Sequence, residues 1–146
     1  MYHKPILYKW ETNGEKTECL PGWEVLVPPL TDLDRLAAYA NALANWSISD
    51  YIQFELTEQA FRWIQRELSG ITLKEIGRLM HEFVANGGTI DEVLETRPEW
   101  VGSYEFHWDL RFELRSKPIY IETRLNYRLP VMADESWILV VNIHAP

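Results

Sequence analysis

The fold is decided by residues 104–115, which read Tyr-Glu-Phe-His-Trp-Asp-Leu-Arg-Phe-Glu-Leu-Arg. Apolar and polar side chains alternate through the whole of this stretch. Because successive side chains of a strand point to opposite sides of a sheet, the pattern predicts a half-buried β-strand. One side of this strand is aromatic and aliphatic, and the other carries only ionisable groups.

Two further strands are predicted after it, at 118–128 and 137–144. The second of these is apolar on both sides as far as Val141, which is typical of a strand that lies inside a sheet. Three strands that follow one another along the chain predict an antiparallel meander. Strand-like stretches near 52–56 or 23–27 could extend this sheet.

Residues 31–97 have the 3.6-residue apolar period of helices instead. The helix starts are marked by side chains that can cap exposed backbone N–H groups. The sequence predicts a first helix from Thr31 or Asp32 and a second after Thr57. It predicts a third at 73–86, capped by Thr72, and a short fourth from Thr89 to Arg97.

Helices first and a meander after them indicate an α+β domain over 1–146, with three to four helices packed on one face of a small antiparallel sheet. Residues 1–30 are expected to be irregular with short strands, 31–97 helical with a short strand, and 104–144 the antiparallel sheet. A chain of 146 residues is long enough to bury a core without disulfides or a structural metal.

The chain carries 14 Lys and Arg against 22 Asp and Glu, a formal charge of -8. Nucleic acids and anionic membranes are bound mainly through clustered cations, so this balance disfavours nucleic acid without excluding a local basic stripe. The single cysteine, Cys19, allows no internal disulfide and no thiolate metal cage. Cofactor and metal motifs, a signal peptide and a membrane-length apolar run are all missing from the sequence. We therefore expect a cytoplasmic protein without cofactor, metal or membrane association, whose partner is another protein.

The polar side of the 104–115 strand can be paired with the strand that follows. A two-residue loop at Ser116 and Lys117 would place Arg115 opposite Pro118. This register sets Arg111 opposite Glu122, Asp109 opposite Arg124 and His107 opposite Asn126. Polar residues then face polar residues, and the charged pairs have opposite signs, which is the favourable arrangement across two strands.

These polar side chains are the candidate site. Histidine is the side chain suited to proton transfer near neutral pH, so His107 could act as a general acid or base. Arg111 and Arg124 could bind a phosphate or carboxylate through their planar guanidinium groups, and Glu122 could orient either. His144 could join them if the last strand lies next to the second. A base, an acid and a cation brought together are what phosphodiester cleavage without a metal requires.

The same face also has a structural interpretation, which we favour at this point. Cross-strand ion pairs stabilise exposed antiparallel sheets by about 0.2–1 kcal/mol each and keep them soluble. An arginine that is already paired with a carboxylate is also less available to an anion.

The chain from about residue 56 to 144 resembles, in its layout, small bacterial toxins of the RelE and colicin ribonuclease type. The resemblance begins with residues 56–68, Leu-Thr-Glu-Gln-Ala-Phe-Arg-Trp-Ile-Gln-Arg-Glu-Leu, and continues through 71–76, a short helix and three strands. In those families two helices precede an antiparallel sheet that cradles RNA. The resemblance therefore implies a metal-independent ribonuclease, with His107, Arg111 and Arg124 at its site. Related sequences often carry a histidine near the position of Gln59, and they are commonly basic where this chain is acidic.

Three functions are compatible with these features. Acidic charge, seven Trp and seven Tyr favour a non-catalytic protein-interaction protein of bacterial type, accessory or immunity-like, with an exposed Trp and Tyr patch rimmed by acids. The alternative is a toxin-like, metal-independent ribonuclease that uses the charged sheet face. The third is a small-ligand pocket between the helices and the sheet. We take the interaction protein as the leading hypothesis.

Overall fold

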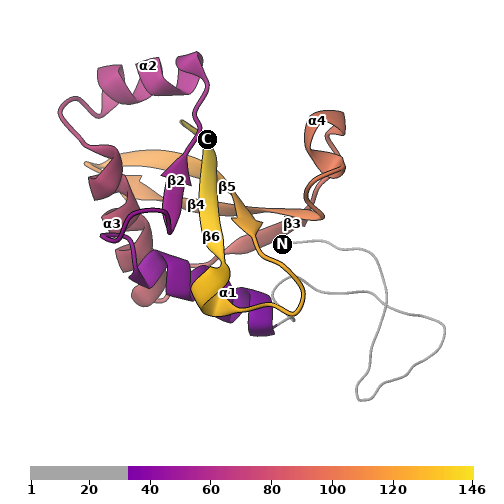
Figure 1. Cartoon of the computed structure of the whole chain (residues 1–146). Helices are drawn as coiled ribbons and strands as arrows, with labels where there is room; N and C mark the ends of the chain where they lie inside the picture. The colour runs from indigo at the N-terminus through magenta and orange to yellow at the C-terminus, as the bar shows by residue number, and fades with distance from the viewer. Residues whose placement is uncertain (1–32) are drawn as a thin grey trace.

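The computed structural model describes residues 33–146 of the chain. Its elements form an α+β fold, which confirms the predicted class (Figure 1). They are α1 (Leu33–Ala44), β2 (Ile52–Phe54), α2 (Glu58–Glu67), α3 (Leu73–Ala85), β3 (Asp91–Leu94), α4 (Pro98–Val101), β4 (Phe106–Leu114), β5 (Lys117–Asn126), the 3-10 helix η2 (Ala133–Glu135) and β6 (Trp137–His144). The strand candidate at 23–27 and the capping residues Thr31 and Asp32 lie outside the described residues.

Within the described part of the chain, the sheet has five strands in the order β2-β6-β5-β4-β3. The strands from β3 to β6 are antiparallel neighbours in chain order, so the predicted meander is present and begins one strand earlier than expected. β2 pairs with β6 in parallel, with Ile52 opposite Ile138, which confirms the strand near 52–56 and makes the sheet mixed. β6 therefore lies inside the sheet, in agreement with its apolar sequence.

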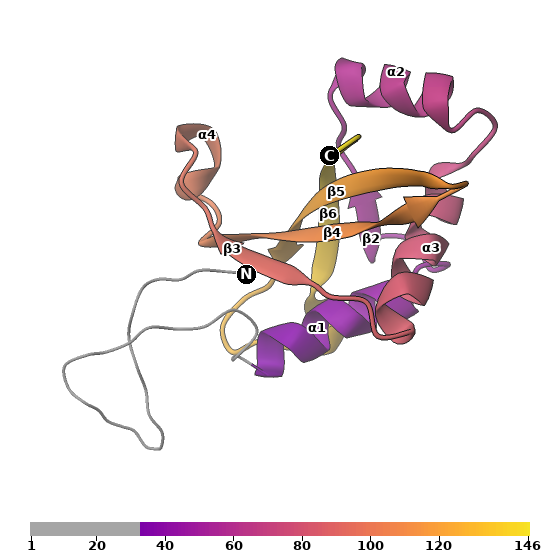
Figure 2. The same ribbon diagram turned by 180° about the vertical axis from the view of Figure 1, so that it is seen from behind.

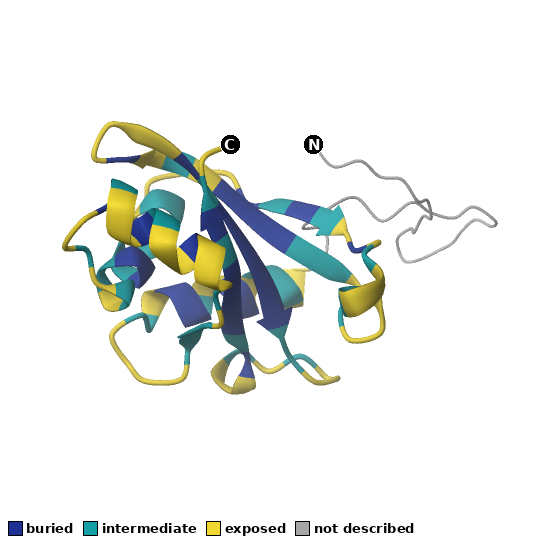
Figure 3. Cartoon of the chain, turned by 90° about the horizontal axis from the view of Figure 1, so that it is seen from above, coloured by how far each residue is buried: buried dark blue, intermediate teal, exposed yellow. Residues whose placement is uncertain are grey.

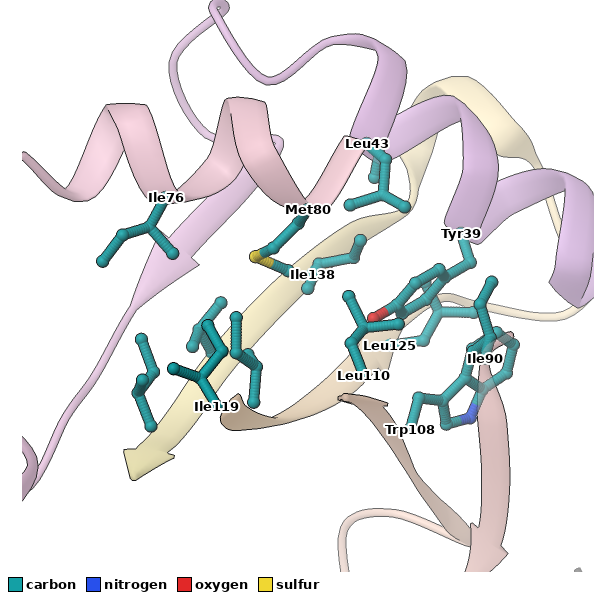
Figure 4. Close-up of a cluster of buried hydrophobic side chains, with 14 of the residues drawn as sticks. Tyr39, Leu43, Ile76, Met80, Ile90, Trp108, Leu110, Ile119, Leu125 and Ile138 are labelled. Atoms are coloured by element: carbon teal, nitrogen blue, oxygen red, sulfur yellow. The ribbon is translucent and has the colours of Figure 1, made fainter. Parts of the chain in front are cut away.

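The hydrophobic core lies between the sheet and the helices α1 and α3 (Figure 4). Leu43 of α1 and Met80 of α3 face Leu110 and Ile138 of the strands, and all four are at most 1% exposed. Burying one such side chain stabilises the fold by about 1.5–3 kcal/mol. The apolar side of the 104–115 stretch thus builds the core, as its alternation predicts.

Tyr39 joins α1 to the sheet through both its ring and its hydroxyl group. The ring stacks on Trp108 with centroids 4.6 Å apart, and the hydroxyl oxygen lies 2.8 Å from Oγ1 of Thr123. Thr123 donates its own hydrogen to the Trp108 carbonyl at 2.6 Å, so Tyr39 is the donor to Thr123. Burial raises the pKa of Tyr39, and the phenol therefore stays protonated in this apolar setting.

Two of the predicted helix caps are confirmed in atomic detail. Thr57 accepts a hydrogen bond from the backbone N–H of Ala60 at the start of α2, and Thr72 accepts one from Glu75 at the start of α3. On α2 the helical apolar period would bury Phe61, but Phe61 is 45% exposed and Ala60 takes the buried position. α2 packs on β6, and both α2 and α4 lie on the opposite side of the sheet from α1 (Figures 1 and 2), so the prediction that the helices all pack on one face is wrong.

The predicted short helix from Thr89 to Arg97 is wrong. Residues 91–94 form β3, which pairs antiparallel with β4, and α4 begins only at Pro98. The spacing of Thr89 and Glu92 is that of a capping box. The unpaired edge of β4 offers these residues a ladder of backbone hydrogen bonds, and this tertiary pairing overrides the local signal.

The predicted register of the β4–β5 hairpin is wrong by two positions. The loop consists of Arg115 and Ser116, so Leu114 lies opposite Lys117. A shift of two positions keeps every side chain on its own side, and for this reason the alternation could not exclude it. The predicted pairs of Arg111 with Glu122 and Asp109 with Arg124 are replaced by Arg111 opposite Tyr120 and Asp109 opposite Glu122.

A β-bulge interrupts the pairing of β5 with β6. Glu122 lies opposite Asn142 and the next residue, Thr123, lies opposite Val140, so Val141 is an extra residue in β6. On both sides of the bulge, the side chains of β6 alternate regularly between the core and the polar side of the sheet. The residues of β6 that face the core are Ile138, Val140 and Ile143.

The hairpin loop provides a test of the fold. Arg115 and Ser116 have φ values of 54° and 66°, the left-handed conformation that both central residues of a type I′ turn adopt. We expect Ser116→Gly to raise the free energy of unfolding by about 0.5–1 kcal/mol, because glycine adopts this conformation without steric cost. Urea denaturation measures the change, with Ser116→Ala as the control that keeps the Cβ atom. A glycine variant less stable than the alanine variant would contradict this turn.

Candidate functional site

The side of the sheet opposite the core is the candidate site, which we call the polar face. α2 and α4 border it, and no helix of residues 33–146 lies above the strands between them (Figure 3). The four predicted site residues are all on this side, and His144 joins them because β6 lies next to β5. The polar face consists of Asp91, His107, Asp109, Arg111, Tyr120, Glu122, Arg124, Asn142 and His144.

Three carboxylates lie side by side across the polar face. Strand pairing places Asp91 opposite Asp109, and Asp109 opposite Glu122. Like charges directly opposite one another destabilise a sheet, so each carboxylate needs a partner of its own. Asp91 accepts a hydrogen bond of 2.6 Å from Arg111, and Asp109 lies 2.9 Å from His107.

The third carboxylate, Glu122, belongs to a buried ion cluster of Glu95, Arg97, Glu122 and Arg124. Arg124 is fully buried, and its Nη2 atom lies 2.7 Å from Glu95 and 2.8 Å from Glu122. Arg97 bonds both carboxylates from the solvent side. The ring of Trp100 covers Arg124, with Cζ 4.6 Å from the ring centroid. Arg124 is therefore enclosed by protein groups, and it has no surface with which to contact a ligand.

Burial and ion pairing act in opposite directions on the cluster. Burial raises the pKa of Glu122, but the hydrogen bonds and charges of Arg97 and Arg124 outweigh it and hold this pKa below its ordinary value. The same balance lowers the pKa of Glu95. The hydrogen bond to Glu122 is the main reason why the pKa of Arg97 is raised. Both carboxylates and Arg97 are therefore ionised at neutral pH.

His107 and Asp109 form a dyad on β4. The Nδ1 atom of His107 lies 2.9 Å from Oδ1 of Asp109. A carboxylate accepts hydrogen bonds, so Nδ1 carries the hydrogen and Nε2 of the neutral ring has a lone pair. The Asp109 side chain is 2% exposed and that of His107 is 15% exposed. A buried carboxylate thus orients an imidazole that solvent can reach, as in many enzymes that use histidine as a base.

A second group on the polar face consists of three planar side chains in contact, with the His144 ring tilted by 45° to the ring of Tyr120. The guanidinium of Arg111 lies 4.8 Å from the ring centroid of Tyr120, and the rings of Tyr120 and His144 are 4.9 Å apart. Burial, the charge of Asp109 and a hydrogen bond to it raise the pKa of Tyr120, so its phenol is protonated. Arg111 is 53% exposed and remains within reach of a ligand.

Several residues of the site were not predicted from the sequence. Asp91, Glu95 and Arg97 fall in or beside β3, in the segment predicted to be a helix, and Trp100 follows in α4. Asp109, which bonds His107 in the structure, was predicted to pair with Arg124 instead. Two residues separated by one position on a strand share a side, so the spacing of His107 and Asp109 carried a signal for this dyad.

The surface of residues 33–146 lacks the aromatic patch expected of an interaction protein. Its exposed large apolar side chains are Leu33, Ile48, Phe61, Leu94, Val101, Leu129 and Met132, and none is a Trp or Tyr. In the same part of the chain, no three His, Cys, Asp or Glu side chains are grouped as a metal site. No helix of this region has the length and apolar character needed to cross a bilayer.

The buried ion cluster leads to a prediction on stability. Glu122→Gln removes one charge that faces buried Arg124, and we expect the free energy of unfolding to fall by about 3 kcal/mol or more. Glu135→Gln is the matched control, because Glu135 is 50% exposed in its pair with Arg128 and should change stability by about 0–1 kcal/mol. Urea denaturation at pH 7 measures both variants. Equal effects of the two substitutions would show that the cluster is not a buried network.

The lowered pKa values predict how stability depends on pH. Between the folded pKa of Glu122 and its ordinary value of 4.5, the unfolded chain binds more protons than the folded protein. The contribution of Glu122 and Glu95 to the free energy of unfolding is thus complete above pH 4.5, and it is lost as the pH falls through their pKa values in the folded protein. Urea titrations from pH 7 downward should show this loss, with a shallower slope for Glu122→Gln than for Glu135→Gln. Parallel slopes would contradict the assignment.

Comparisons of the chain with family models, with curated proteins and with solved structures found no match. The function is therefore inferred from the geometry of the polar face.

Proposed function

We propose that the protein is a metal-independent ribonuclease that cleaves single-stranded RNA on the polar face. The observation that carries this proposal is the dyad of His107 and Asp109, a solvent-accessible imidazole whose Nδ1 is held by a buried carboxylate. The dyad belongs to β4, on the polar face. We assign the protein to the cytoplasm, where such an enzyme would meet its substrate.

Two exposed arginines flank the dyad at the ends of the carboxylate row. Arg111 pairs with Asp91 at one end, and Arg97 pairs with Glu122 at the other. Their side chains are 53% and 42% exposed. Arg111 uses one nitrogen on its carboxylate and Arg97 uses three on its two, so each of the two guanidinium groups, with five N–H donors, has donors to spare. Either arginine can therefore reach a phosphate that lies over Asp109.

The charges of the polar face are nearly balanced, so we expect weak and salt-sensitive RNA binding. Three arginines are set against four carboxylates when the buried cluster is included. These are Arg97, Arg111 and Arg124 against Asp91, Glu95, Asp109 and Glu122.

The reaction assigned to this geometry is cleavage by the neighbouring ribose hydroxyl. The Nε2 atom of His107 takes the proton of the 2′-OH, and the resulting oxygen attacks the adjacent phosphorus. The bond from phosphorus to the 5′ oxygen breaks, which leaves a 2′,3′-cyclic phosphate, and the 5′ oxygen takes a proton from solvent. Arg97 and Arg111 stabilise the negative charge that builds up on the phosphoryl oxygens.

The arrangement of elements gives further support. Two helices, α2 and α3, precede the antiparallel strands β3 to β6, which is the layout in which the chain resembles RelE and colicin-type ribonucleases. The leading alternative from sequence, a non-catalytic interaction protein, has no exposed Trp or Tyr patch to support it within residues 33–146.

The test is cleavage of a pool of unstructured RNA oligonucleotides in the presence of EDTA. The full chain should release fragments that end in 2′,3′-cyclic phosphate, and a DNA pool, which lacks the attacking 2′-OH, should remain intact. His107→Ala should lower the rate by about 10²–10⁴-fold, the usual contribution of a general base. Asp109→Asn should also lower it, because the amide can hold the imidazole in the wrong tautomer.

His81→Ala is the matched control, since His81 lies on α3, on the core side of the sheet, and should leave the rate unchanged. RNA that stays intact with the unaltered chain would overturn the proposal. So would cleavage by His107→Ala at the rate of His81→Ala.

A further inference from the structure

A cavity of about 570 Å³ lies between α2 and β6, beside the polar face. Its size falls in the range of small-molecule binding sites. We call it the α2 pocket. The lining residues that matter here are Gln59, Arg62, Trp63 and Arg66 of α2, and Asn142 and His144 of β6.

Two aromatic side chains line the α2 pocket from different elements. Trp63 is a half-buried residue of α2, and His144 comes from β6, where its ring packs on Tyr120 at 4.9 Å. Nδ1 of His144 donates to the carbonyl of Ala145, so Nε2 of the neutral ring has a lone pair that can accept a hydrogen bond. A planar ring bound in this pocket can stack on either side chain, and stacking of bases on aromatic rings is the main contact by which proteins hold single strands.

Two guanidinium groups stand at the rim of the α2 pocket. Arg62 and Arg66 are one helical turn apart, and their side chains are 69% and 64% exposed. Their partners, Glu58 and Glu67, form exposed ion pairs, which are weak. A phosphate can therefore replace these carboxylates and accept hydrogen bonds from both arginines.

Two amide side chains complete the lining. Gln59 and Asn142 both face the α2 pocket, and neither side chain makes a hydrogen bond to another described residue. Each amide offers a donor and an acceptor, the combination that the edge of a nucleobase requires.

We propose that the α2 pocket is a nucleotide subsite for single-stranded RNA, with one base stacked on Trp63 or His144 and a phosphate bound by Arg62 and Arg66. This inference rests on the proposed ribonuclease function. The contacts of His144 with Tyr120 and of Tyr120 with Arg111 connect the pocket with the polar face, so a bound strand would pass from the pocket toward His107.

The test is an NMR titration of the full chain with the four ribonucleoside monophosphates, followed through the indole N–H signal of Trp63. Ribose 5-phosphate is the probe without a base. The shift of the indole signal should require the base, and Arg62→Ala with Arg66→Ala should weaken the affinity for monophosphates at least tenfold. The double lysine variant should recover part of this loss, because lysine keeps the charge. Arg78→Ala is the matched control, from a similar exposed pair on α3.

The outcomes for the subsite and for the ribonuclease are separable. His107→Ala should bind nucleotides like the unaltered chain, and His144→Ala should bind them more weakly while raising KM for RNA more than it lowers kcat. Cleavage of RNA without any base-dependent shift at Trp63 would overturn the subsite and leave the ribonuclease. Nucleotide binding without cleavage would overturn the ribonuclease and leave a nucleotide site.

Discussion

The structure depends on the two-residue period of β4 and β5. In an extended pair each side chain must point to one side of the sheet or the other, and no residue can change sides without breaking the ladder. Trp108 and Ile121 are thereby fixed in the core, and His107, Asp109 and Glu122 are fixed on the polar face. The same two strands build the core and the candidate site, so packing on one side sets the geometry on the other.

Much of the fold was predictable because its signals are local. Alternation gave the strands, and Thr57 and Thr72 marked helix starts through bonds to residues three positions away. The failures concern contacts between distant segments. β3 forms because β4 provides an edge for it, and the hairpin register cannot be read from alternation, which a shift of two positions preserves. Only the turn conformation at Arg115 and Ser116 decides that register.

In the candidate site, too, local features were predictable and contacts between distant segments were not. His107 was predicted from its own chemistry, and its carboxylate partner is two positions along the same strand. Arg124 was predicted to bind a ligand, but Glu95 and Trp100 enclose it, and both come from a segment more than twenty residues earlier in the chain. Sequence gives the kinds of groups that a face carries. Which of them remain accessible depends on elements that pack over it from elsewhere.

The bulge in β6 has a consequence for how the chain can change in length. Val141 is one residue more than the span of β6 needs, and the alternation of β6 is regular on both sides of it. Deletion of a single residue within 139–141 would therefore remove the bulge and leave Ile138 and Ile143 toward the core and Asn142 and His144 toward the polar face. The same deletion in β4 would turn every following side chain to the wrong side. The two strands therefore differ in how they tolerate deletions, although both carry residues of the polar face.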